Sequence, residues 1–308
     1  MSKARTARAM SDLLGVPVSQ GTVATVTART AAALTVAGGF TDTVRAQLRA
    51  AGLIHLDETG LRVAGRLHWL HSAGTTALTL LHVHRRRGQE AIEAFAVLPG
   101  FTGIAVHDAW APYDTYTTPR HVLCRAHLLR ELSAVIDHHQ LGAAQQGSTS
   151  PAGSWCWAQQ ALETLLAIKT PTDTANSTGS NPHPASLSRH RTRLRHAARI
   201  GANPTTHPDP SRLGNKHRAL ARRIRDRETN YLAFTTHPTI PFDNNLAERD
   251  IRRVKIRQKI SGRLRTLTGA QHFAAIASYT ATAGKNNINT YQALVQLAEG
   301  NAWLPQPT

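Results

Sequence analysis

The chain has 308 residues, of which 41% are hydrophobic, enough for one large domain or about two ordinary ones. It carries 36 Lys and Arg against 19 Asp and Glu, a net charge of +17, so nucleic acid is the first partner to consider. Its two cysteines, Cys124 and Cys156, exclude a disulfide scaffold and favour a reducing compartment. No apolar run reaches the ~18 residues that span a bilayer, so we expect a cytoplasmic protein with no membrane partner.

Residues 1–50 are Ala-rich and predicted to be helical, with Ser19 as a helix N-cap and a pattern similar to a short helix–turn–helix. Strands are then predicted in five runs, at 53–63, 66–74, 76–86, 102–110 and 121–124. Helical spacing appears between the third and fourth runs, a short helix separates the fourth and fifth, and a longer helix follows the fifth. Three strands in hairpin succession and then alternating helices and strands imply an α/β fold, with a mixed sheet covered by helices.

The character of the chain changes after residue 139. Stretches rich in Pro, Ser, Thr and Gly predict linkers at 140–154, 170–186 and 201–211, with helices between them. From residue 244 the pattern is helical again. We therefore expect four parts: a helical N-terminal segment at 1–50, the first part of the core at 51–139, a mostly helical basic insertion at 140–240, and C-terminal helices at 241–308 that complete the core.

The positive charge is concentrated in one segment. Residues 185–265 hold 20 Lys and Arg against 6 Asp and Glu, a net charge of +14. The arginines from Arg189 to Arg199 have almost no acidic residue at the i,i+4 positions where helical side chains pair. A solvated helical surface is the ordinary interpretation of such a run. We nevertheless expect these arginines to be unpaired and to bind the phosphates of DNA or RNA.

Three acidic residues stand at the ends of predicted elements. Asp57 closes the first strand and Asp108 closes the fourth, and these strands can be neighbours in a sheet of this order. Two carboxylates a few Å apart repel each other unless a cation lies between them, and Mg²⁺ is the natural cation for oxygen ligands. Glu248 opens a helix just after the insertion. It is the best candidate for a third ligand in a site with two ions ~3.5–4 Å apart.

Each acid also has an ordinary structural interpretation. Asp57 could belong to a turn, Asp108 could cap a helix, and Glu248 fits a capping box that starts at Asn245. The neighbouring acids that could replace them as ligands are Glu58 and Asp114.

Four segments carry a more specific pattern: HLDETG, AVHDAWAPYDTY, HVLCRAHLLREL and FDNNLAERDIRRVKIRQKISGRLRT. With them the chain resembles the insertion-sequence-sixty-six family of bacterial DDE transposases from about residue 10 to 298, most specifically at Asp243–Arg249. The resemblance implies a ribonuclease-H-like core with a helical insertion before its last acid. It also implies two divalent ions, Mg²⁺ or Mn²⁺, held by Asp57, Asp108 and Glu248, which serve hydrolysis at transposon ends and attack of the freed 3′-OH on target DNA.

The implied partners are double-stranded DNA, further copies of the chain and accessory transposition proteins at the bacterial nucleoid. Family members usually carry an N-terminal extension with DNA-binding and zinc-binding elements, whereas this chain starts inside or just ahead of the core. We therefore expect weak recognition of specific end sequences. Two alternatives stay open: a ribonuclease-H-like nuclease or resolvase that does not join strands, and an inactive DNA-binding remnant.

Cys124 and His127, with His121 nearby, have the spacing of half a zinc site, but a structural zinc site needs four ligands. We expect Cys124 to pack in the core. For His127, core packing and, by the resemblance, contact with DNA near the scissile phosphate are both open. The basic residues expected to contact DNA are Arg249, Arg252, Arg253, Lys255, Arg257 and Lys259 after the third acid, and Arg191 and Arg195 in the insertion.

Overall fold

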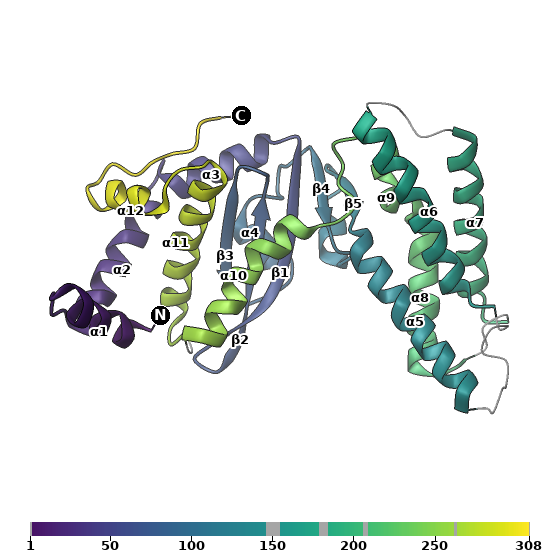
Figure 1. The fold of residues 1–308 in the computed structure, drawn as a ribbon, viewed down its shortest axis with the longest axis horizontal. Coiled ribbons are helices and arrows are strands. Elements are labelled where there is room, and N and C mark those ends of the chain that lie inside the picture. Colours follow the sequence, from purple (N-terminus) through teal and green to yellow (C-terminus); the bar gives the residue numbers. More distant parts are fainter. Residues whose placement is uncertain (1, 146–154, 179–183, 206–208, 262–263, 308) are drawn as a thin grey trace. The chain divides into compact units, whose positions relative to one another are not determined.

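The computed structural model describes residues 2–145, 155–178, 184–205, 209–261 and 264–307 (Figure 1). The chain forms two compact units. The first unit combines Met1–His121 with Asn244–Thr308, and the second unit is Val122–Asp243.

The sheet has five strands in the order β3-β2-β1-β4-β5. The strands are β1 (Leu53–Val63), β2 (Arg66–Gly74), β3 (Thr79–His84), β4 (Ile104–His107) and β5 (Arg120–Leu123). Strand β2 is antiparallel to both β1 and β3, whereas β1 and β4 are parallel. Helix α4 (Gln89–Phe95) and the 3-10 helix η1 (Ala111–Thr115) stand in the connections that precede β4 and β5. The predicted mixed sheet flanked by helices is confirmed.

The hairpin between β1 and β2 follows from its two turn residues. Ala64 and Gly65 both have positive φ angles, 49° and 80°, and Val63 pairs with Arg66 across them. Two consecutive residues with positive φ form the type I′ turn, whose twist matches that of the flanking strands. Glycine at the second position adopts this conformation without steric cost.

Helices cover the sheet of the first unit (Figure 1). They are α1 (Lys3–Leu14), α2 (Gln20–Thr35), α3 (Phe40–Ala50), α10 (Asn245–Ser261), α11 (Leu267–Lys285) and α12 (Thr290–Ala298). Helix α10 packs on β1 and β2, and α11 packs on β3. Ser19 caps α2 as predicted, because its hydroxyl accepts the backbone N–H of Thr22 at 2.9 Å.

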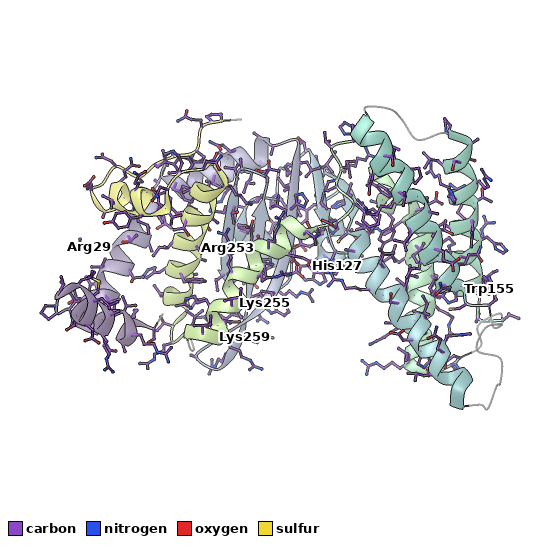
Figure 2. The ribbon with its side chains drawn as sticks, viewed as in Figure 1. Arg29, His127, Trp155, Arg253, Lys255 and Lys259 are labelled. Carbon is purple, nitrogen blue, oxygen red and sulfur yellow. The ribbon has the colours of Figure 1, made fainter. Side chains whose placement is uncertain are left out.

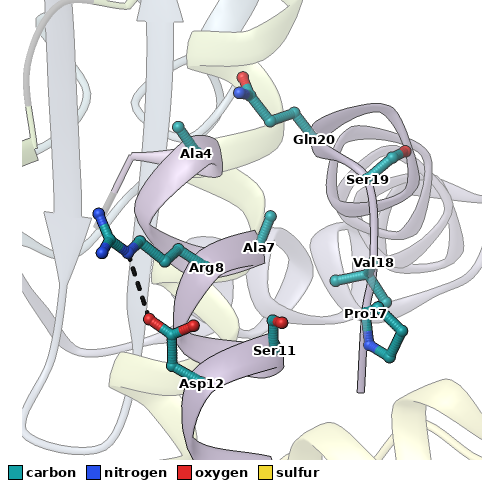
Figure 3. A pocket seen from close by; sticks show the side chains of 9 residues that line it. All are labelled: Ala4, Ala7, Arg8, Ser11, Asp12, Pro17, Val18, Ser19 and Gln20. Carbon is teal, nitrogen blue, oxygen red and sulfur yellow. Dashed lines mark hydrogen bonds and ion pairs between the residues drawn. The ribbon is translucent and has the colours of Figure 1, made fainter. Parts of the chain in front are cut away.

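The core of the first unit joins its N-terminal and C-terminal helices. Phe40 and Tyr279 are fully buried and meet edge to face with their ring centroids 5.0 Å apart. The outer helices leave an open pocket between α1 and the start of α2 (Figure 3). This pocket is lined by Ala4, Ala7, Arg8, Ser11, Asp12, Pro17, Val18, Ser19 and Gln20.

The second unit is helical. Its helices are α5 (Arg125–Gln145), α6 (Trp157–Thr178), α7 (Pro184–Ala202), α8 (Arg212–Asp226), α9 (Glu228–Tyr231) and η2 (Ala233–Thr235). Leu165 of α6, Leu194 of α7 and Ile224 of α8 are at most 1% exposed. A Cβ at Gly201 would collide with the ring of Trp157, so glycine lets α6 and α7 approach closely at that point.

Helix α6 is longer than predicted, which makes the linker prediction wrong over residues 170–178. The helix passes through Pro171 and ends at Thr178. The hydroxyl of Thr172 donates to the carbonyl of Ile168 at 2.8 Å, and Lys169 forms an i,i+4 ion pair with Asp173. These local contacts and the burial of Thr172 offset the backbone hydrogen bond that proline removes. Parts of the three predicted linkers, at 146–154, 179–183 and 206–208, lie outside the described residues.

Among the described residues no single helix has the length and apolar character needed to cross a membrane, and only α2 and α3 taken together as a bent pair meet that requirement.

Candidate active site

Two of the predicted acids stand at matching positions along adjacent parallel strands: Asp57 lies inside β1, not at its end as predicted, and Asp108 directly follows β4. Strands β1 and β4 pair in parallel, and the last registered pair joins His55 to Val106. Asp57 and Asp108 each lie two residues beyond that pair. Both carboxylates are oriented by local backbone donors: an Asp57 oxygen accepts the N–H of Glu58 at 2.9 Å, and an Asp108 oxygen accepts the N–H of Trp110 at 3.0 Å.

The third predicted acid, Glu248, acts electrostatically on Asp57. Burial and the negative charges of Glu58, Asp108 and Glu248 together raise the pKa of Asp57 to about 7, against the lowering effect of the hydrogen bond from the Glu58 N–H. Charges act on a carboxyl in this way only over short distances. Asp57 therefore lies within electrostatic reach of both Asp108 and Glu248 in the first unit.

Asn244 explains how Glu248 reaches this place. Its side chain is completely buried, its amide nitrogen donates to the carbonyl of Leu56 at 2.7 Å, and its amide oxygen lies 2.8 Å from Nδ1 of His55. The N–H of Glu248 donates to the carbonyl of Asn244 at 3.2 Å, which opens helix α10. Asn244 thus fastens the start of the helix to β1 beside Asp57.

The start of helix α10 differs from the capping box predicted at Asn245. The first helical hydrogen bond closes on Asn244, so the helix begins one residue earlier than a capping box starting at Asn245 requires. The sequence does not reveal that Asn244 anchors helix α10, because its partners lie 188 and 189 residues away on β1. The only signal in the sequence was the pair of asparagines in the D-N-N-L-A-E-R motif.

Glu58, the first rival ligand, has other partners. Its side chain is 1% exposed, and it accepts hydrogen bonds from the Tyr113 hydroxyl at 2.6 Å and from Nε of Arg87 at 3.1 Å. The Arg87 guanidinium also lies over the rings of Trp110 and Trp69, 4.3 and 4.7 Å from their centroids. Burial and the charge of Asp108 raise the pKa of Glu58, whereas Tyr113 and Arg87 lower it. The Glu58 carboxylate is therefore already engaged by Arg87 and Tyr113.

Most of the basic residues predicted on α10 are exposed. Arg252, Lys255 and Lys259 follow Glu248 at intervals of four, three and four residues, so they share its side of the helix. Figure 2 shows Arg253, Lys255 and Lys259 along the helix. Arg249, Arg252, Arg253, Lys255 and Lys259 are exposed, and Arg257 is half-buried. The Arg257 guanidinium lies 4.1 Å from the centroid of the Phe273 ring, and burial lowers its pKa.

In the second unit Arg191, Arg193 and Arg195 of α7 have acidic partners, which corrects the expectation from the sequence for these three. Glu228 is nearly buried, and its carboxylate accepts Nε of Arg191 at 2.9 Å and the guanidinium of Arg195. Arg193 forms an ion pair with Glu163 at 3.1 Å. The acidic partners stand on other helices, where an i,i+4 rule cannot detect them. Whether Arg191 and Arg195 also contact DNA stays a prediction.

Cys124 and His127 both belong to the second unit. Cys124 is 2% exposed, in agreement with the predicted packing role. His127 is half-buried on α5, and its contact with DNA stays a prediction.

Comparison with known proteins identifies the family. The family model described as "Transposase IS66 family" matches residues 1–272. No curated protein and no solved structure matches the chain significantly. Because the family model covers far more than half of the 308 residues, the chain belongs to the IS66 family of transposases.

Proposed function

We propose that this chain catalyses divalent-metal-dependent cleavage and transfer of DNA strands during transposition, with Asp57, Asp108 and Glu248 as metal ligands. The observation that carries the proposal is the placement of Asp57 and Asp108 at matching positions on parallel strands, beside a helix that brings in Glu248. Acids gathered in this way repel one another, which fits a site that binds cations.

The donor set fits Mg²⁺ or Mn²⁺. All three side chains offer carboxylate oxygens, the ligands that hard divalent cations prefer. Two such ions would activate the attacking oxygen and stabilise the leaving oxygen of a phosphodiester. The chain contributes orientation: backbone N–H groups hold Asp57 and Asp108, Asn244 anchors the helix of Glu248, and Glu58 is kept in place by Arg87 and Tyr113.

The basic side chains of α10 supply a path for the DNA backbone. Arg252, Lys255 and Lys259 extend away from Glu248 along one side of the helix. Phosphates that flank a scissile bond held at Glu248 can follow this row. Transposon ends and target DNA are the proposed partners, and a homo-oligomer assembled on DNA would supply one site for each end.

The test is divalent-metal-dependent nicking and joining on DNA that contains the transposon ends. We expect Glu248→Gln to abolish both reactions, because the site loses a full negative charge facing the cations. Gln keeps the shape of the side chain, so the free energy of unfolding should change by about 1 kcal/mol or less.

Glu299→Gln is the matched control, since Glu299 is exposed beyond α12. It should nick and join like the wild type. If Glu248→Gln also nicks like the wild type, Glu248 is not a ligand and the proposal is wrong. If the wild type nicks DNA but never joins the 3′-OH to a target, the protein is a nuclease and not a strand transferase.

A further inference from the structure

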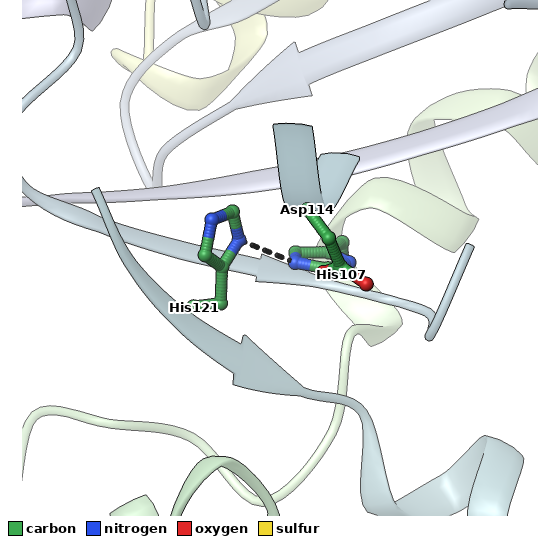
Figure 4. A group of neighbouring side chains, drawn as sticks. All are labelled: His107, Asp114 and His121. Carbon is green, nitrogen blue, oxygen red and sulfur yellow. Dashed lines mark hydrogen bonds between the residues drawn. The ribbon is translucent and has the colours of Figure 1, made fainter. Parts of the chain in front are cut away.

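A second cluster of ligand-type side chains lies next to the acids, in the connections around β4 and β5. His107 is the last residue of β4, Asp114 lies in η1, and His121 lies in β5 (Figure 4). Each offers one ligand atom, and these three atoms all lie within 4.8 Å of one another. His107 is completely buried, His121 is half-buried and Asp114 is exposed. The cluster therefore has one open side.

One nitrogen of each histidine ring contacts a backbone carbonyl oxygen. Nδ1 of His107 contacts the carbonyl oxygen of Asp108, and Nε2 of His121 lies 2.6 Å from the carbonyl oxygen of Tyr116. A carbonyl oxygen can only accept, so the tautomers that satisfy both carbonyls place the ring protons on these two nitrogens. In the neutral rings the other nitrogens, Nε2 of His107 and Nδ1 of His121, then both carry a lone pair.

These two lone pairs point at each other. Nε2 of His107 and Nδ1 of His121 are 2.9 Å apart. Two lone pairs at this distance repel each other, and a metal ion bound by both nitrogens removes that repulsion.

We propose that His107, His121 and Asp114 bind one Zn²⁺ ion, with a water molecule on the exposed side as the fourth ligand, separate from the cations proposed at Asp57, Asp108 and Glu248. Two neutral imidazoles and a carboxylate suit zinc, whereas Mg²⁺ prefers oxygen ligands only. A histidine that binds a metal almost always donates its other N–H to a carbonyl, a carboxylate or water, and both rings do so. Zinc–nitrogen bonds of about 2.0–2.1 Å in a tetrahedral site separate the nitrogens by about 3.3 Å, so the rings need to part by only a few tenths of an ångström.

The ion would cross-link β4, η1 and β5 and so restrict the motion of the segment that begins at Asp108. Tyr113, in the same 3-10 helix as Asp114, donates to Glu58. His107, His121 and Asp114 therefore act on the proposed active site as positioning residues, by fixing the loop that carries one of its acids.

The test is calorimetric titration of Zn²⁺ into the chelator-treated full chain in saturating Mg²⁺, followed by amide hydrogen exchange. We expect one Zn²⁺ per chain and slower exchange over residues 108–121. Even outer-shell partners of zinc ligands contribute about 10–100-fold to affinity, so His121→Gln should weaken binding by at least about 100-fold. Asp114→Asn should weaken it similarly, and because Asp114 is exposed this variant should fold normally.

His196→Gln removes an exposed histidine of α7 and Asp57→Asn removes a proposed Mg²⁺ ligand, and both should bind Zn²⁺ like the wild type. The proposal is wrong if the wild type binds no Zn²⁺ under these conditions, or if His121→Gln and Asp114→Asn bind it unchanged. The zinc result is independent of nicking: loss of Zn²⁺ binding refutes this site alone, and nicking that survives Glu248→Gln refutes the proposed function alone.

Discussion

The first unit collects carboxylates of like charge, whereas the second surrounds a carboxylate with arginines. Around Asp57, the acids Glu58, Asp108 and Glu248 all raise its pKa. Around Glu228 in the second unit, two guanidinium groups neutralise a side chain that is 7% exposed. Both regions bury ionisable groups, and Glu58 has the guanidinium of Arg87 as its counter-charge, but the charges that act most strongly on Asp57 are all negative.

This difference separates a binding site from a structural network. Like charges held together lower the stability of the folded chain, and such an arrangement is maintained where a ligand of opposite charge binds. Opposite charges with good hydrogen bonds form a network whose disruption leaves an uncompensated charge. The acids of the first unit fit the first description, and Glu228 fits the second.

The most sensitive test of the second unit is Glu228→Gln. The change leaves Arg191 and Arg195 side by side without their carboxylate. Breaking a buried pair costs about 3–5 kcal/mol, and because these arginines are 36% and 52% exposed we expect a smaller loss of about 2–3 kcal/mol in urea denaturation. Glu163→Gln is the control, since Glu163 and its partner Arg193 are each 49% exposed and the loss should stay below about 1 kcal/mol. Equal losses in both variants would show that Glu228 is an ordinary surface pair.

In the first unit, removing a buried carboxylate is expected to stabilise the folded chain instead of destabilising it. Asp57→Asn should stabilise the metal-free chain at pH 8 by about 1–2 kcal/mol, because it removes a buried charge that its neighbours repel. The raised pKa alone would correspond to about 4 kcal/mol at 1.36 kcal/mol per unit, but the new amide brings two N–H donors that need partners. Asp12→Asn, which breaks an exposed pair with Arg8, should change the stability by less than about 0.5 kcal/mol. A destabilised Asp57→Asn would mean that the carboxylate is structural.

Local pattern was enough to locate the five strands and to pair the two aspartates, although β3 and β4 are shorter than predicted. Strands β1 and β2 have the predicted bounds, 53–63 and 66–74, because their residue pattern is bounded by a turn that only a few residue types adopt. The order of the elements also predicted that β1 and β4 are neighbours, which brings Asp57 and Asp108 to matching positions. Local rules failed at Pro171, where helical contacts and burial outweighed the ordinary preference of proline.

Side-chain hydrogen bonds and ion pairs between distant residues could not be predicted. The ion pair of Arg191 with Glu228 spans 37 residues, and the hydrogen bond from Asn244 to Leu56 spans 188. The contact of His107 with His121 spans only 14 residues. Its use as a metal site depends on which nitrogen of each ring contacts a backbone carbonyl. Such facts depend on tertiary geometry, which neither composition nor spacing contains.

The smallest expected effect is a change in the salt dependence of DNA binding, and it compares the basic residues of α10 with those of α7. Lys255 is exposed on the side of α10 that follows Glu248, whereas Arg195 is held by Glu228. A lysine that neutralises one phosphate releases counterions, so Lys255→Gln should reduce the slope of log affinity against log salt by about 0.9. The loss of affinity should be similar for DNA of any sequence, since a phosphate contact carries no base information.

Fluorescence anisotropy with a labelled duplex at several salt concentrations measures this slope, and Arg195→Gln is the matched variant. The guanidinium of Arg195 already interacts with Glu228, so its removal should change the slope by much less than the removal of Lys255. Equal changes in slope would show that Arg195 contacts phosphate while it pairs with Glu228, so that the second unit also tracks the DNA backbone. An unchanged slope for Lys255→Gln would exclude Lys255 from the DNA path, and a path along α10 would then have to rest on Arg252 and Lys259.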